Sequence, residues 1–332
     1  MSKSENPTNV VVANSPFDDP NADLVILSSD GALFYVHSLL LSPVSPLFNT
    51  MFTLPSPTDK VHSQKIHDGH PLVTVSDDAK HLRLLLSWCD PRCMQIETCL
   101  SDLQMVLEMA DKYDVASVIK RVESVLMLSK ETIKENPLKI YAIALRYRRE
   151  GLARVAAKET LRSNYPLVRL DGKKGPELKH PSAFAFEEYQ LRCVAAAVKV
   201  VSEYSWMSHS GPGRKFSGMS YFMGSCTNYG DKCPTIITSF GTFLVWWINY
   251  MELSAEALKQ APVGSSVMEP LLLSQIHSQI SSGKCTSCHS QGHAKLSEFA
   301  GFLAVKVDRA ISKVTGFLTI STPVQWNLTS PM

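Results

Sequence analysis

The chain has 332 residues, of which 45% are hydrophobic, so it can bury the apolar surface that two ordinary domains need. Lysine and arginine (33) nearly balance aspartate and glutamate (31), and this net charge of +2 excludes the strongly basic surface typical of nucleic-acid binding. The longest apolar stretch, residues 240–251, falls short of the ~20 residues that a membrane-spanning helix needs, so we expect no membrane partner.

The first residues contain no apolar run of the kind found in a secretory signal, which favours a cytoplasmic or nuclear protein. Thiols stay reduced in both compartments, so clustered cysteines there indicate metal ligands before disulfides.

Residues 1–20 are polar, contain three prolines and lack periodicity, so we predict a disordered tail. Structure is expected to begin at Asp23, with a strand over 24–27, a turn at Asp30-Gly31, a strand over 32–36 and a short helix over 38–41. A further strand at 72–75 and several amphipathic helices complete a predicted module over residues 21–128. The pattern predicts a small sheet surrounded by short helices.

One helix start in this module carries a sequence signal of its own. Ser101 and Gln104 have the spacing of a capping box, in which a serine side chain accepts from the first backbone N–H groups of a helix. We therefore expect Ser101 to be the N-cap of the helix that follows.

Several motifs of this module occur in an order that resembles a BTB/POZ domain. They are Asp23-Leu-Val-Ile, Phe34-Tyr-Val-His37, Leu39-Leu-Leu-Ser42, Leu47-Phe-x-x-Met51-Phe52, Leu84-Leu-Leu-x-Trp88 and Leu107-x-x-Ala110-Asp-Lys-Tyr113. The chain is similar in particular to basidiomycete-type fungal BTB proteins with a helical C-terminal region. The resemblance implies a homodimer or heterodimer whose interface includes Asp23, Leu39 and Leu40.

Two features depart from the pattern of the family. A basic residue usually follows the histidine that matches His37, whereas Ser38 stands here, so the resemblance does not imply the corepressor pocket of some members. Several cullin-binding members carry a hydrophobic-x-Glu motif in the loop matching 53–60, and no glutamate occurs there. A substrate adaptor of a cullin-3 ubiquitin ligase nevertheless stays an alternative function, since a helical extension can also supply contacts.

The second half of the chain is predicted to be helical. Residues 129–170 resemble a short BACK-like extension, and residues 171–320 form a helical C-terminal domain that follows a polar linker and precedes a tail over 321–332. The final helix is expected to run from Leu296 to Phe317, because apolar residues recur there in steps of four and three. Trp246, Trp247 and Tyr250 either pack the second core or bind a partner, and packing is the favoured interpretation.

Cysteine spacing gives the second half its candidate site. Cys226 with Cys233 and Cys285 with Cys288 form two pairs that could hold one structural Zn²⁺ as a tetrahedral thiolate set, with His289 or His293 as alternative ligands. Two other interpretations stay open, a polar loop without a metal and a thiol redox protein using Cys285 and Cys288. The remaining cysteines are expected to act as small hydrophobic residues in or near a core; they are Cys89, Cys93, Cys99 and Cys193.

No nucleotide-binding, zinc-protease or serine-hydrolase motif occurs in the chain, and we find no candidate catalytic residues or cofactor-binding residues. The sequence therefore predicts an α+β fold, mainly α, with a BTB/POZ module followed by a helical domain. The predicted function is non-enzymatic protein–protein interaction through self-association, with an unknown protein partner of the C-terminal domain.

Overall fold

The computed structural model describes residues 10–53, 66–93, 99–162, 181–203, 219–223 and 233–314. The chain divides into two units, Met1–Thr132 and Ile133–Met332. The elements of the first unit are β1 Val11–Val12, β2 Leu24–Leu27, β3 Ala32–Val36, α1 Ser38–Leu41, α2 Pro46–Thr53, β4 Ile66–His67, β5 His70–Thr74, α3 Ala79–Cys89, α4 Leu100–Lys112 and α5 Ala116–Leu128.

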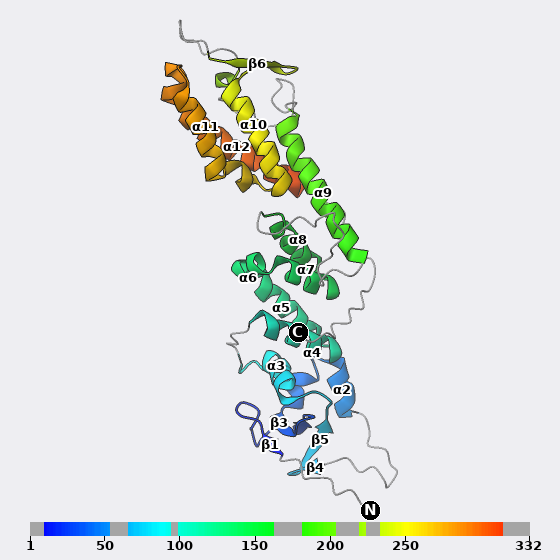
Figure 1. The fold of residues 1–332 in the computed structure, drawn as a ribbon. Helices are drawn as coiled ribbons and strands as arrows, with labels where there is room; N and C mark the ends of the chain where they lie inside the picture. The colour runs from blue at the N-terminus through cyan, green and yellow to red at the C-terminus, as the bar shows by residue number, and fades with distance from the viewer. Residues whose placement is uncertain are drawn as a thin grey trace, which may run out of the picture. The chain divides into compact units, whose positions relative to one another are not determined.

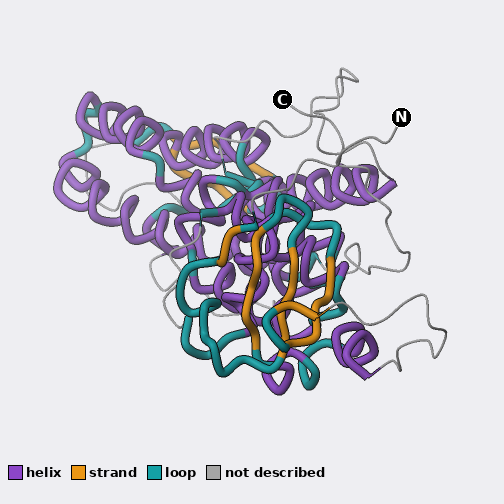
Figure 2. Tube along the Cα trace, turned by 90° about the horizontal axis from the view of Figure 1, so that it is seen from below, coloured by secondary structure: helices purple, strands orange, loops and turns teal. Residues whose placement is uncertain are grey.

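A five-stranded sheet in the order β1-β3-β2-β5-β4 forms the base of the first unit, and its strands lie side by side in Figure 2. β2 and β3 form the predicted hairpin, with Leu24 opposite Val36. Gly31 takes a φ of +89°, a conformation that glycine adopts without steric cost, and so closes the turn. β5 then pairs parallel to β2, which requires the crossover that α1 and α2 supply.

Successive side chains of a strand point to opposite faces of the sheet. Buried residues occur on both faces. Val25, Leu33 and Tyr35 belong to one buried cluster. Phe34 lies on the other face, where its ring is 5.7 Å from that of Phe17 and the Arg83 guanidinium of α3 lies over both rings. α3 is thereby placed against the sheet.

The tail prediction was wrong for residues 10–20. Val11 and Val12 form β1 and pair parallel with β3, and Phe17 is buried with 1% exposure. The segment is otherwise polar, so its composition did not indicate that its one aromatic residue, Phe17, packs in the core. Residues 1–9 lie outside the described residues.

The helix that Ser101 was expected to cap starts two residues earlier. Cys99 is the N-cap residue of α4, and its side chain makes no capping hydrogen bond. Ser101 instead lies in the first turn, where its Oγ is 2.9 Å from the Cys99 Sγ. The apolar spacing of the helix was predicted well, since Leu103, Val106 and Leu107 are buried.

The second unit consists mainly of helices. Its elements are α7 Pro137–Arg146, α8 Glu150–Glu159, α9 Pro181–Ser202, β6 Thr235–Thr238, β7 Gly241–Leu244, α10 Val245–Gln260, α11 Pro270–Ser282 and α12 His293–Ser312, with short helical turns at Met219–Tyr221, Gly264–Met268 and Cys288–Gly292, while α6 Lys130–Glu135 spans the boundary between the units. Figure 1 shows α9 running alongside α10 and α12, with α11 next to α10.

Aromatic side chains fill the core between these helices. The Trp247 ring is 4.7 Å from that of Phe243 and 5.6 Å from that of Phe299, and Trp247 is fully buried. Tyr250 is also fully buried and donates a hydrogen bond of 2.9 Å to the Val267 carbonyl oxygen. Trp246 is 8% exposed. All three aromatic residues singled out in the sequence therefore pack the second core.

The last helix is shorter than its apolar pattern predicted. α12 ends at Ser312, and Val314 lies beyond it, while Phe317 is outside the described residues. The N–H of Lys313 already turns back to the carbonyl oxygens of Ala310 and Ile311, which closes the helix.

The architecture confirms the fold class, an α+β fold that is mainly helical, with a small N-terminal sheet and a helical C-terminal region. Within the described residues, no helix combines the length and the apolar character that crossing a membrane requires.

Candidate functional site

The surface around α1 is the first candidate site. Leu39 is 79% exposed, although Leu41, two residues later in the same short helix, is almost completely buried. Leu40 is partly buried. Leu39 and Leu40 together leave apolar surface of α1 open to solvent.

Asp23 fixes the start of α1. Its carboxylate accepts hydrogen bonds from the Ser38 backbone N–H, at 2.7 Å, and from the Ser38 hydroxyl. Partial burial opposes ionisation of Asp23, but these two hydrogen bonds outweigh it, and the pKa of Asp23 lies below its usual value. Asp23 is exposed in the single chain, so it is accessible to a partner at α1.

A charged cluster next to Asp23 was missed in the sequence. His37 Nε2 lies 3.1 Å from Asp19 Oδ2, and Arg92 lies 3.5 Å from the same carboxylate and 2.7 Å from that of Asp90. Burial opposes ionisation of Asp90, but the hydrogen bonds from Arg92 outweigh it, so the pKa of Asp90 is lowered. His37 is half-buried beside the Asp19 carboxylate. Little in the sequence indicated this cluster, because Arg92 is 55 residues from His37 in the chain.

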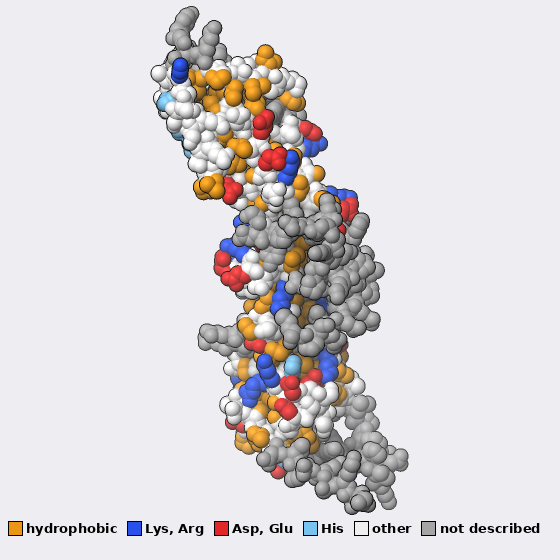
Figure 3. All heavy atoms as spheres, viewed as in Figure 1, with side chains coloured by type: hydrophobic (Ala, Val, Ile, Leu, Met, Phe, Trp, Pro, Cys, Tyr) orange, Lys and Arg blue, Asp and Glu red, His pale blue; other side chains and the backbone are white. Residues whose placement is uncertain are grey.

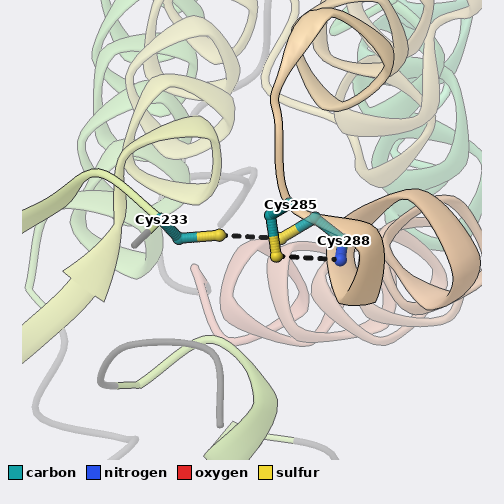
Figure 4. A group of neighbouring side chains, drawn as sticks. All are labelled: Cys233, Cys285 and Cys288. Atoms are coloured by element: carbon teal, nitrogen blue, oxygen red, sulfur yellow. Dashed lines mark hydrogen bonds between the residues drawn. The ribbon is translucent and has the colours of Figure 1, made fainter. Parts of the chain in front are cut away.

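The second candidate site is a cluster of three cysteines in the second unit (Figure 4). Cys233 stands two residues before β6, and Cys285 and Cys288 lie between α11 and α12. The three sulfurs all lie within 4.8 Å of one another, and the Sγ atoms of Cys233 and Cys288 are 3.3 Å apart. All three side chains are buried. The structure thus brings together segments that are about fifty residues apart in sequence.

This geometry fits a tetrahedral metal site. With Zn–S bonds of ~2.3 Å, neighbouring sulfurs of a tetrahedron are about 3.8 Å apart. The sulfurs here lie within 4.8 Å of one another, and those of Cys233 and Cys288 are 3.3 Å apart. The backbone N–H of Cys288 also points at the Cys285 sulfur, at 3.4 Å. Such an N–H group stabilises negative charge on sulfur, and a metal ligand must be a thiolate.

The loop expected around Cys285 and Cys288 is instead a helix start. Cys288 opens a π-helical turn, Cys288–Gly292, that leads directly into α12. The Tyr221 hydroxyl donates a hydrogen bond of 3.3 Å to the Ser287 carbonyl oxygen between the two cysteines. The segment that carries Cys285 and Cys288 is therefore held in place by the helix and by this hydrogen bond.

The two alternative histidine ligands make other contacts. His289 Nε2 is 2.6 Å from the Gly283 carbonyl oxygen, and His293 Nδ1 is 2.7 Å from His277 Nδ1. Among the described residues, the group of potential ligands contains the three cysteines and neither histidine. Cys226, the fourth predicted ligand, lies outside the described residues.

The remaining cysteines divide between core and surface. Cys193 is fully buried, and burial raises its pKa to about 11, while burial raises that of Cys89 to about 12. Both are therefore protonated and behave as small hydrophobic residues. Cys93 is partly buried, but Cys99 is exposed, so the core prediction was wrong for Cys99.

The segment in which a cullin-binding motif was sought, 53–60, lies outside the described residues after Thr53. The cullin-adaptor alternative stays a prediction.

Comparison with known proteins assigns the first unit. Residues 14–130 match the BTB/POZ domain. No curated protein matches the chain. The match covers β2 to β5 and α1 to α5, and it supports a role in protein–protein interaction.

Proposed function

We propose that this chain is a non-enzymatic protein–protein interaction protein that self-associates through its N-terminal BTB/POZ domain. The match over residues 14–130 carries the proposal. The proposal includes the likeness of the chain to fungal BTB proteins with a helical C-terminal region, which rests on the sequence alone. The self-associating surface is the one that exposes Leu39 and Asp23, with Leu40 at its edge, and a second copy or a related chain would cover it.

The exposure of Leu39 supports this assignment. Fully burying a leucine side chain contributes about 1.5–3 kcal/mol, and an isologous interface buries it twice, once from each copy. Because Leu39 is exposed to water in the single chain, its burial between two copies would contribute this free energy to association. Asp23 and Ser38 add hydrogen bonds that keep the helix start rigid.

Substitution of Leu39 tests the proposal. Leu39→Asp places a charge at the centre of the surface, opposite its own copy, and we expect light scattering to show a loss of self-association at every concentration. Leu128→Asp is the matched control, because Leu128 is 82% exposed in the same unit and lies on α5. Equal molar masses for Leu39→Asp and wild type would contradict the assignment of this surface.

The second part of the proposal is a structural Zn²⁺ held by Cys233, Cys285, Cys288 and Cys226. The three described sulfurs supply the geometry, and their burial favours a structural ion over a redox pair, since a redox thiol must be reached by its substrate. Bound there, the ion would join the start of the β6–β7 hairpin to the start of α12.

The position of Cys226 in the chain supports its role as fourth ligand. Cys226 comes three residues after Met223, which bridges to Phe243 in β7, and seven residues before Cys233. Both described ends of this segment therefore lie at the β6–β7 hairpin.

Metal analysis of the purified chain tests the zinc site. We expect about one Zn²⁺ per wild-type chain and loss of the ion in Cys285→Ser, because three ligands bind far more weakly than four. Cys99→Ser is the control, since Cys99 is exposed and outside the cluster. A folded wild type that binds no zinc after incubation with the ion and a reductant would contradict the site.

A further inference from the structure

β6 leaves one edge of its sheet without a partner. The sheet of the second unit has two strands, and β6 pairs with β7 alone among the described residues. The other edge of β7 is occupied, since Met223 bridges to Phe243. Every second residue of a strand directs its N–H and C=O groups away from a single neighbour, so the outer edge of β6 carries backbone groups ready for pairing.

The side chains of β6 are apolar and unusually accessible. Ile237 is 84% exposed and Ile236 is 39% exposed. Sheet edges in soluble proteins usually carry a lysine, a proline within the strand or an inward charge that blocks pairing. β6, whose sequence is Thr-Ile-Ile-Thr, has none of these. Its edge is therefore built to accept another extended strand.

Charge points to the identity of that strand. No charged residue occurs from Cys233 to Met251, and on the face seen in Figure 3 the side chains around β6 are hydrophobic or uncharged. A charge on a two-fold axis meets its own copy, so an uncharged centre suits an interface between identical chains. A different partner could offer opposite charges instead.

We propose that β6 pairs antiparallel with β6 of a second copy of this chain, which joins two hairpins into a four-stranded sheet. Such a two-fold axis is perpendicular to the sheet and passes beside one residue, which then faces its own copy. An axis at Ile236 or at Ile237 places isoleucine opposite isoleucine, at Cβ separations of about 4.5–5.5 Å. The pairing of the two β6 strands also stabilises both hairpins, because a sheet of three or more strands is more stable than a two-stranded hairpin.

Together with the proposed N-terminal surface, this pairing gives each chain two self-associating surfaces. The β6 pairing stands by itself, whereas the consequence for assembly rests on the proposed function. When the axes of two such interfaces on one chain differ, one dimer does not satisfy both, and the chains form linear assemblies that grow with concentration. The first interface also raises the effective concentration for the second.

Sedimentation velocity on the full-length chain tests the pairing. For wild type we expect the average sedimentation coefficient to keep rising with concentration beyond that of a dimer. Ile237→Lys should abolish the larger species, with association weakened by about tenfold or more, because two lysines oppose each other at the edge. Ile237 is so exposed that this change leaves the fold intact, which circular dichroism checks. Val305→Lys, at a 60% exposed valine on α12, is the matched control and should sediment like wild type.

A mixing experiment identifies the occupant of the edge. Ile237→Lys and Ile237→Glu should each stop at the smaller species, and a mixture of the two should restore the larger ones, because lysine then meets glutamate across the axis. An unchanged distribution for Ile237→Lys, or a mixture that fails to reassemble, would overturn the inference. If Ile237→Lys yields monomers and Leu39→Asp changes nothing, the β6 pairing stands and the proposed N-terminal surface fails.

Discussion

At the scale of single residues, Tyr113 shows how one side chain joins several elements of the first unit. Its hydroxyl donates a hydrogen bond of 2.6 Å to Asp77, and Lys112 forms an ion pair with the same carboxylate. The Tyr113 ring stacks on Phe48 at 4.8 Å, and its carbonyl oxygen accepts from the Ser45 hydroxyl. The Ala110-Asp-Lys-Tyr113 segment thus fastens the end of α4 to α2 and to the turn before α3.

The Tyr113 hydroxyl is a testable part of this clamp. Tyr113→Phe removes the hydrogen bond to a charged acceptor, and we expect the free energy of unfolding to fall by about 1–2 kcal/mol in chemical denaturation. Tyr141→Phe is the control, because Tyr141 is also buried and burial alone, without an acidic partner such as Asp77, raises its pKa. A cost for Tyr141→Phe equal to that for Tyr113→Phe would contradict the role of Asp77.

The same residue predicts a dependence on alkaline pH. Burial, and then the hydrogen bond and negative charge of Asp77, raise the pKa of Tyr113. The unfolded chain loses its tyrosine protons near pH 10, whereas folded Tyr113 keeps its proton. This contribution is therefore complete below about pH 10 and is lost as the pH rises further. Denaturation at pH 8 to 11 should show a fall in stability that is smaller in Tyr113→Phe; equal falls would contradict it.

At the scale of elements, local patterns predicted the first unit well. The hairpin β2–β3 and helix α1 have the bounds that the sequence indicated, because alternating strands around Asp30-Gly31 and a short apolar run leave few other structures. The β6–β7 hairpin was missed, since Phe243 and Leu244 continue without a break into the apolar start of α10. Periodicity does not separate a buried strand from a buried helix in such a run.

The candidate site could be predicted only in part. Their spacing identified Cys285 and Cys288 as a pair of candidate ligands, and the sulfur of Cys233 lies close to both, as expected. Spacing does not show which residues converge, and the histidines close to the hook make other contacts. Short-range patterns likewise gave no indication that Arg92 lies beside Asp19, because that contact depends on the tertiary fold.

Two glycines give a matched prediction about the contact of α12 with the turn Gly264–Met268. A Cβ at Gly264 would overlap the Ala304 carbonyl oxygen, whereas a Cβ at Gly301 meets open space. We expect Gly264→Ala to destabilise the second unit by about 1–3 kcal/mol. Gly301→Ala should stabilise it by about 0.5–1 kcal/mol, because alanine favours the helix. Thermal unfolding followed by circular dichroism measures both, and effects of the same sign would contradict the proposed packing.

At the scale of the whole molecule, the proposed metal would stabilise the second unit alone. Cys233, Cys285 and Cys288 all belong to that unit, so the ion would tie its hairpin to α12. A ligand present at 100 to 1,000 times its dissociation constant stabilises the folded state by about 3–4 kcal/mol. We therefore expect a chelator to lower the unfolding temperature of wild type and of Cys99→Ser, and to leave Cys285→Ser unchanged. A chelator effect on Cys285→Ser as large as that on wild type would contradict the site.

Self-association is the central claim, because both the N-terminal surface around Leu39 and the edge of β6 require a second copy. The direct measurement is the molar mass of the unmodified full-length chain by sedimentation equilibrium across a wide range of concentrations. We predict a mass of at least two chains that increases further with concentration. A mass of one chain at every concentration would contradict it.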